Sequence, residues 1–289
     1  MRSSCPQRKV PYSVEALALG IFAAVLLKGE DPGVRPDELV AKHLASIGAP
    51  EAIAAARSRV ISGNAEVTFR LPRPGHFNGS GTVLSDGRRL GIRMIFSSVE
   101  YPWEELTYDG RKVTVSQVRP GERSPLSEFV YQWDVLLKEG LLGGTMTTAW
   151  ALLDVPGRKP RLEYGGIRNF EGKRSHELKY WAKTGPTDLH VSLYFEQETF
   201  RHLHTRIWLT QLAGMAAGAN LSSEKRETLY TLVESYSDFR AVDSLTLPHR
   251  YKLVQMIDAQ NTAVLLEYGI TAASVVHNQT FDPKLFTVP

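Results

Sequence analysis

The sequence predicts a mainly antiparallel β protein (α+β) in which a few helices pack on one large sheet. Three observations support this fold class. Apolar and polar residues alternate over many short stretches, which is the pattern of strands with one buried face. Short polar turns connect these stretches, whereas parallel neighbours would need a crossover of about a dozen residues or more. The chain shows neither an internal repeat nor a regular alternation of strand and helix patterns.

Composition limits the classes of protein to consider. The 289 residues suffice for one large domain or two small ones, and 43% of them are hydrophobic, so the chain can bury a sizeable core. The formal charge of +3 and the isoelectric point near 8.9 are only mildly basic. Lysines and arginines form no cluster, which argues against nucleic-acid binding. The single cysteine, Cys5, excludes an intrachain disulfide and a cysteine-based metal site.

The N-terminal segment has the layout of an export signal. A basic stretch, Met1–Lys9, precedes an unbroken apolar run, Ala16–Leu27, and this order is typical of a secretory signal. The run is shorter than the roughly 20 residues that a spanning helix needs. We therefore expect residues 1–28 to be an export signal or an N-terminal anchor, followed by a linker rich in proline and glycine at residues 29–36. The alternative is a buried helix of the folded domain.

The domain is expected to begin with two helices and to continue as strands. Acidic residues in the first turn and an apolar stripe predict a helix from Asp37 to Gly48. Pro50 opens a second, short helix that reaches Ala56. The period then changes to two, and strands are expected at Ala65–Leu71, Gly79–Leu84, Leu90–Phe96, Trp103–Tyr108 and Lys112–Val118.

A helical insertion interrupts the strands at about residues 119–160. Apolar residues recur at helical spacing from Leu126 to Leu137, and Gly140 is placed to cap that helix. A second helix is expected over Thr145–Asp154. We assign residues 37–289 to a single domain that contains this insertion.

Strands resume at Arg161, which brings the total to roughly ten. The last three form an antiparallel meander joined by short polar turns. A curved sheet of this size with helices packed on it leaves a concave apolar interior, which is either filled as core or open as a pocket. The expected strands are Glu177–Trp181, Leu189–Phe195, Leu203–Leu209, Leu229–Tyr236, Tyr251–Ile257 and Val264–Thr271.

Several strand-and-turn motifs resemble a known family. Tyr236-Ser-Asp-Phe-Arg, Leu247-Pro-His and the terminal Phe281-Asp-Pro-Lys-Leu-Phe-Thr-Val-Pro resemble the ending of bacterial outer-membrane lipoprotein-sorting proteins and their carrier-like (LolA/LolB-like) relatives. Two earlier motifs, Tyr108-Asp-Gly-Arg-Lys-Val-Thr-Val and Leu193-Tyr-Phe-Glu-Gln-Glu-Thr-Phe, agree with this resemblance.

The resemblance implies an open half-barrel of roughly ten strands with helices packed on the concave face. In the lipoprotein carrier families, the hydrophobic cavity of such a half-barrel receives acyl chains for passage across the periplasm. The motifs are strand and turn motifs, so they transfer no ligand-binding position to this chain. The long helical insertion at about residues 119–160 departs from the compact carriers.

The candidate ligand-binding residues are therefore chosen from the apolar faces of the strands and of the inserted helix. Successive side chains of a strand point to opposite sides of the sheet, so alternate apolar residues share one face. The candidates are Val67, Phe69, Leu90, Ile92, Met94, Phe96, Phe129, Trp133, Leu193 and Phe195.

No catalytic constellation is visible in the sequence, so we expect a protein that is not an enzyme and that holds no cofactor. The sequence contains no His-Glu-x-x-His helix, no Gly-x-Ser-x-Gly elbow, no phosphate loop and no dinucleotide fingerprint. His202 and His204 are expected on one face of a strand, with His190 on the neighbouring strand. Zinc uses such groups, but a catalytic site needs a third ligand and a base, and we expect no metal.

The expected function is that of a periplasmic carrier or binding protein for a hydrophobic ligand, such as lipoprotein acyl chains or lipid, in the bacterial cell envelope. The alternative is a non-catalytic structural or regulatory module of the envelope that keeps its interior filled and binds a protein partner. Membrane contact would occur through the N-terminal segment, and nucleic acid is not an expected partner.

Overall fold

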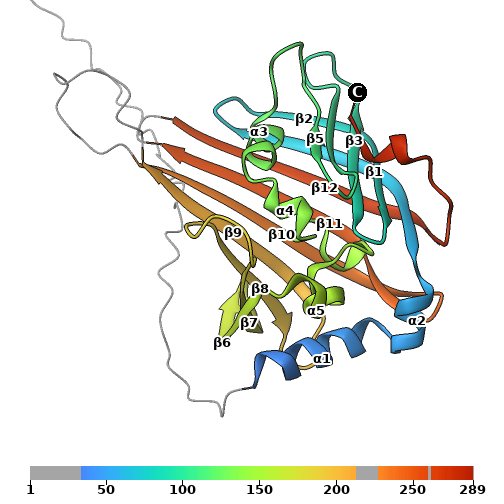
Figure 1. Ribbon diagram of the computed structural model, residues 1–289. Helices are drawn as coiled ribbons and strands as arrows, with labels where there is room; N and C mark the ends of the chain where they lie inside the picture. The colour runs from blue at the N-terminus through green and yellow to red at the C-terminus, as the bar shows by residue number, and fades with distance from the viewer. Residues whose placement is uncertain (1–33, 213–226, 260–261, 289) are drawn as a thin grey trace, which may run out of the picture. The chain divides into compact units, whose positions relative to one another are not determined.

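The computed structural model describes residues 34–212, 227–259 and 262–288. Within them, twelve strands form one antiparallel sheet in the order β5-β4-β3-β2-β1-β12-β11-β10-β9-β8-β7-β6. The edge strands β5 and β6 each pair with one neighbour in this part of the chain, so the sheet is open (Figure 1). The predicted mainly antiparallel open half-barrel is confirmed, with twelve strands rather than ten.

The first meander starts at the centre of the sheet. It is preceded by two helices that each begin with a proline, which lacks the N–H that would be left unpaired in a first turn. Their positions agree with the sequence prediction to within a residue. The elements are α1 (Pro36–Ile47), α2 (Pro50–Ala55), β1 (Ser58–Leu71), β2 (Gly75–Asp86), β3 (Arg89–Phe96), β4 (Trp103–Tyr108) and β5 (Val113–Val115).

The second meander runs from the opposite edge back to the centre, where β12 pairs with β1. Its strands are mostly longer than the sequence pattern predicts, because the alternation of buried and exposed residues fades toward the strand ends. They are β6 (Arg161–Phe170), β7 (Lys173–Trp181), β8 (His190–Glu196), β9 (His202–Leu212), β10 (Glu227–Val242), β11 (Leu245–Ala259) and β12 (Thr262–His277), followed by the short 3₁₀ helix η3 (Pro283–Phe286).

This topology forces the insertion across the sheet. Strands β5 and β6 are adjacent in the sequence but lie at opposite edges of the twelve-stranded sheet. The chain between them must therefore pass over one face of it. We call residues 119–160, which make this crossing, the cover. Figure 1 shows its helices α3, α4 and α5 in front of the sheet.

The cover is less helical than the sequence predicts. Its elements are α3 (Pro125–Gln132), α4 (Val135–Lys138), the 3₁₀ turns η1 (Gly144–Met146) and η2 (Ala151–Asp154), and α5 (Val155–Arg158). The helix predicted over Leu126–Leu137 is broken at Trp133, whose backbone leaves the helical region. After the break the chain forms α4, in which Val135, Leu136 and Leu137 are all buried.

The helix predicted over Thr145–Asp154 is wrong. Every residue from Gly140 to Thr147 is buried, which one side of a regular helix cannot achieve. The chain instead makes two separate turns, with extended backbone at Thr147 between them and positive φ at Gly143 and Gly144 before them. The irregular backbone therefore allows the side chains on both sides of residues 140–147 to be buried.

The expected export signal or anchor at residues 1–28 lies outside the described residues. In the part of the chain that the structure describes, no helix combines the length and the hydropathy needed to cross a membrane.

Gly140→Ala should destabilise the protein strongly, because it would disrupt the end of α4. A Cβ atom there would lie 1.8 Å from the carbonyl oxygen of Ala149, and φ is +65°. We expect the free energy of unfolding in urea to fall by more than about 2 kcal/mol. Gly172→Ala is the matched control, since φ is +79° but no atom lies within 4 Å of the added Cβ. It should cost about 1 kcal/mol. Equal losses in the two variants would contradict the close packing of the cover.

Candidate functional site

The site is the face of the sheet that lies under the cover, which we call the inner face. Paired residues on neighbouring strands run across it in continuous rows, because facing residues of antiparallel strands point to the same side. Most members of these rows are apolar and buried. One row consists of Leu178, Leu193, Thr205, Glu234, Leu253, Tyr268, Val67 and Phe77.

The structure places the predicted ligand-binding residues in the packed core between sheet and cover. Eight of the ten side chains are 5% exposed or less: Val67, Leu90, Ile92, Met94, Phe96, Phe129, Leu193 and Phe195. Phe69 and Trp133 are half-buried and pack against the same core. Nine come from the inner face or from α3. Trp133 instead lines a hollow of about 430 Å³ beside α4 and Thr184–Pro186. Their role in ligand binding stays a prediction.

Apolar contacts join the cover to the inner face over its whole length. At one end, the ring of Phe129 on α3 lies 5.7 Å from that of Tyr230 on β10. At the other, Trp150 stacks on His202 of β9, with the ring centroids 4.6 Å apart. The side chain of Gln255, buried on β11, donates from Nε2 to the carbonyl oxygen of Pro125 at 3.0 Å. The cover therefore fills the concave face in this conformation.

A buried carboxylate on β4 holds the start of α3. Glu104 is fully buried, and its Oε1 accepts hydrogen bonds from Ser124 Oγ at 2.9 Å and Ser127 Oγ at 2.5 Å. Its Oε2 accepts from the hydroxyl of Tyr101, which lies 2.8 Å from that of Tyr268. Burial raises the pKa of Glu104. Ser124 also caps α3 by accepting from the backbone N–H of Ser127. The anchor thus depends on the same residues that start the helix.

A second buried carboxylate, on β10, holds the middle of the cover. Glu234 is fully buried, and its Oε1 accepts from the backbone N–H of Gly143 and from the hydroxyl of Tyr251, both at 2.8 Å. Burial is the main cause that raises the pKa of Glu234 to about 7. Glu104 and Glu234 therefore both accept hydrogen bonds from the cover.

Three polar atoms lie around Gly144 without a hydrogen-bond partner in the described part of the chain. They are Glu234 Oε2, Tyr236 Oη and His202 Nδ1. A Cβ at Gly144 would lie 2.7 Å from Tyr236 Oη and 2.9 Å from His202 Nδ1, so only glycine fits against them. Leaving a buried polar group unpaired costs about 1–3 kcal/mol. These unpaired atoms therefore reduce the stability of the conformation in which the cover lies on the sheet.

Two buried arginines complete the attachment of the cover. Arg59 on β1 donates from Nη1 to the carbonyl oxygen of Thr145 at 2.8 Å. Arg158 at the end of α5 donates to the carbonyl oxygens of Lys138 and Ala149 at 2.8 and 2.9 Å. The second arginine joins two parts of the cover to each other, whereas the first joins the cover to the sheet.

The expectation that His202 and His204 share a face of one strand is wrong. The pairing of β8 with β9 shifts between Tyr194 and Phe195, and this irregularity turns His202 to the inner face and His204 to the outer one. His202 is buried against Phe195, and burial lowers its pKa well below the usual value. His204 instead lies near Ser235. Among the described residues, no three His, Cys, Asp or Glu side chains gather as metal ligands would.

Sequence reasoning missed the carboxylates and arginines that hold the cover. The sequence did contain a signal for the two carboxylates. Glu234 is two residues away from both Leu232 and Tyr236, and Glu104 is two residues away from Leu106. In a strand with a period of two, each acid is therefore placed on the buried side. The role of the arginines depends on backbone carbonyls of the cover, which no side-chain pattern reveals.

Comparison with known proteins gives fold-level similarity. No protein-family model matches the sequence, and no curated protein matches it. A solved outer membrane lipoprotein-sorting protein domain from Vibrio parahaemolyticus is 11% identical, with a TM-score of 0.45 over 86% of this chain and 94% of that one. A LolA superfamily protein from Nitrosomonas europaea is 14% identical, with a TM-score of 0.45 over 89% and 99%.

A DUF1329 family protein from Desulfovibrio piger is 9% identical, with a TM-score of 0.42 over 88% of this chain and 98% of that one. The first two of these structures carry the family description that the sequence motifs resemble. At these identities and TM-scores, the similarity concerns the fold alone.

Glu234→Gln should remove a pH dependence from the stability of the fold. Because the pKa of Glu234 is raised to about 7, the folded protein binds this proton more tightly than the unfolded chain, whose pKa is 4.5. The stability that the proton provides is present below the unfolded pKa and lost as pH rises through 7. Relative to the variant, the parent should lose up to about 3 kcal/mol between about pH 4 and 7.

The free energy of unfolding in urea is measured for both proteins across that pH range, and the value of the variant is subtracted from that of the parent at each pH. Taking a difference is necessary because burial lowers the pKa values of His43 and His202, which changes stability with pH in the opposite direction in both proteins. Glu163→Gln, which removes an exposed ion pair with Lys179, is the control. A difference between parent and Glu234→Gln that does not change with pH would refute the buried acid at this position.

Proposed function

We propose that this chain binds the apolar part of a lipid or acylated protein on the inner face of its sheet, with the cover displaced, and acts as a carrier or binding protein in the bacterial cell envelope. The observation that carries the proposal is the way the cover is attached. It lies on a continuous apolar face and is joined to the sheet by a handful of polar contacts, chiefly to Glu104, Glu234 and Arg59.

The end of the inner face near α3 supports an entry point for such a ligand. Three half-buried aromatic side chains lie there: Phe69, Phe77 and Tyr230. Phe69 contacts Phe77, and Tyr230 contacts Phe129 of the cover. Phe69 also contacts Tyr101, with ring centroids 5.1 Å apart, and Tyr101 donates to the carboxylate that anchors α3. An acyl chain that enters beside these rings would therefore meet the anchor of the cover first.

The second candidate function is the module that keeps its interior filled and binds an envelope protein. The burial of eight predicted ligand-binding side chains favours it, since these residues already pack against the cover as a core does. The two candidates differ in one physical quantity, the free energy needed to lift the cover. A carrier needs this free energy to be low enough for the ligand to compensate it.

Ser127→Ala separates the two candidates. It removes the hydroxyl that donates to Glu104 at 2.5 Å and leaves every apolar residue of the inner face unchanged. A hydrogen bond to a charged group contributes about 1.5–3 kcal/mol, so its loss should shift the cover toward the open state about tenfold. We expect the apparent affinity for a fluorescent acyl probe to rise by about the same factor, measured by fluorescence titration and displacement with unlabelled lipid.

Ser192→Ala is the matched control for this experiment. Its hydroxyl donates to Glu177 at 2.7 Å, also a nearly buried carboxylate, but on the outer face of β7 and β8. It should lower stability without changing probe affinity. Absence of probe binding to both the parent and Ser127→Ala would eliminate the carrier and leave the filled module.

Export of the chain is tested separately with the N-terminal segment. Residues 1–35, fused to a reporter that is active only outside the cytoplasm, should give activity, because a basic stretch and an apolar run precede the folded domain. The control is the same fusion with Leu19 and Ile21 changed to Glu, which interrupts the run. A silent parent fusion, with the protein recovered from the cytosol, would exclude an envelope function.

A further inference from the structure

Arg59 is a buried cation whose positive charge has no carboxylate in contact. Its side chain lies on β1 and is 4% exposed. Nε donates to His277 Nε2 at 3.0 Å, and Nη1 donates to the carbonyl oxygen of Thr145 at 2.8 Å. Neither acceptor is a carboxylate. Within the described residues, no Asp or Glu forms an ion pair with this guanidinium. Burial lowers the pKa of Arg59 to about 10, so it is still protonated at neutral pH.

Asp243 lies on the far side of the His277 imidazole from Arg59, so it compensates the positive charge of Arg59 only at a distance. His277 Nδ1 is 2.9 Å from Asp243 Oδ2, so the imidazole stands between the carboxylate and the guanidinium. The side chain of Asp243 is 72% exposed, and water screens an exposed charge strongly. Among the described residues, no other acid stands this close to the guanidinium through a hydrogen-bonded partner.

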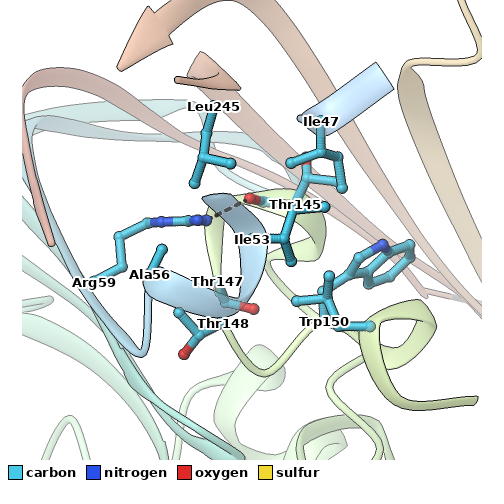
Figure 2. Close-up of a pocket in the computed structure, with 10 residues that line it drawn as sticks. Ile47, Ile53, Ala56, Arg59, Thr145, Thr147, Thr148, Trp150 and Leu245 are labelled. Atoms are coloured by element: carbon cyan, nitrogen blue, oxygen red, sulfur yellow. Dashed lines mark hydrogen bonds between the residues drawn. The ribbon is translucent and has the colours of Figure 1, made fainter. Parts of the chain in front are cut away.

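The guanidinium also lines a small hollow between α2, η1 and the start of β11, shown in Figure 2. Its volume of about 20 Å³ is enough for one occupant of about the size of a water molecule. The hydroxyl of Thr145, buried at its wall, has no hydrogen-bond partner in the described part of the chain. Arg59 Nη2 has no such partner there either. The remaining lining carries no acid and consists of Ile47, Ile53, Ala56, Thr147, Thr148, Trp150, Leu153 and Leu245.

We propose that this hollow binds a single small monovalent anion of halide size, held between the Arg59 guanidinium and the Thr145 hydroxyl. A buried charge is costly unless an opposite charge accompanies it. A water molecule in the hollow would satisfy the hydrogen bonds but not the charge. The hollow has room for an occupant of about the size of a water molecule, which suits a monatomic anion, and the apolar lining favours a weakly hydrated anion over a strongly hydrated one.

The bound anion would join three separate segments. Arg59 belongs to β1, Ile53 and Ala56 to α2, and Thr145 to the cover. An anion that binds the folded protein alone stabilises it in proportion to the logarithm of its concentration. The site exists while the cover lies on the sheet, so its test on protein without added lipid does not depend on the proposed function.

The direct test is a crystal of the full chain grown in sodium bromide. The anomalous signal of bromide should give a peak in the hollow, within hydrogen-bond distance of Arg59 Nη2 and Thr145 Oγ1. A hollow that contains only water, in crystals that show bromide elsewhere on the surface, would overturn the proposal.

The solution test compares thermal unfolding in sodium chloride, bromide and gluconate at one ionic strength. Gluconate is too large for the hollow, so Tm should rise by about 2–4 °C in the halides and the rise should saturate. Equal Tm values in gluconate and in halide would contradict the site. Thr145→Val keeps the guanidinium and the shape of the residue but removes the hydroxyl, and it should reduce the halide response.

Two arginine variants test whether the rise of Tm in halide arises at the hollow. Arg59→Met should abolish it. Arg158→Lys is the matched control, because Arg158 is also buried and bonded to carbonyl oxygens of the cover but does not line the hollow. It should lower Tm and leave the halide response intact. If Arg59→Met fails to fold, Thr145→Val and the bromide crystal decide the matter. A full halide response in Thr145→Val together with a bromide-free hollow would place the effect elsewhere.

Discussion

Two carboxylates on the inner face, Glu104 and Glu234, determine where the cover lies. Each is fully buried, and a buried carboxyl group without donors would cost several kcal/mol, of order 2–7 for a polar group and more for a charge. The sheet itself supplies only tyrosine hydroxyls to them. The remaining donors, Ser124, Ser127 and the backbone N–H of Gly143, all come from the cover. The cover is therefore bound at two fixed points, and the apolar contacts between these points follow from that attachment.

The order of the strands explains why such a cover exists. Because the chain leaves the sheet at one edge and re-enters it at the other, β5 and β6 are joined by a segment that spans the whole face. A segment in this position has to bury its own apolar side chains and also satisfy the polar groups of the face beneath it. Its irregular turns at Gly143 and Gly144, where φ is positive, meet both demands at the point where the unpaired polar atoms of β9 and β10 gather.

Much of the sheet could be predicted from the sequence, because alternation of apolar and polar residues reports one buried face directly. Leu90 to Phe96 forms β3 as the pattern indicates, and the terminal meander is β10 to β12. The cover could not be predicted in the same way. Leu141 and Leu142, together with the residues around them, are buried on all sides, so neither a period of two nor one of 3.6 appears there.

The candidate site was only partly predictable for a related reason. The apolar residues of the inner face follow from strand parity, and all four of Leu90, Ile92, Met94 and Phe96 are buried together. Whether that face is a ligand cavity or a core depends on the segment that covers it. Arg59 shows the limit most clearly, since its partners are a backbone carbonyl of the cover and a histidine at the far end of β12, which only the folded chain brings together.

The central claim is that the cover can leave the inner face while the sheet stays folded. Native-state hydrogen exchange of the full chain tests it most directly, because each amide reports the free energy of the opening that exposes it. Amides of the cover, such as those of Gly143, Met146 and Thr147, should exchange through an opening of lower free energy than amides of β10 to β12. Exchange of both groups with one common free energy, equal to that of global unfolding, would show that cover and sheet are a single core and would contradict the account.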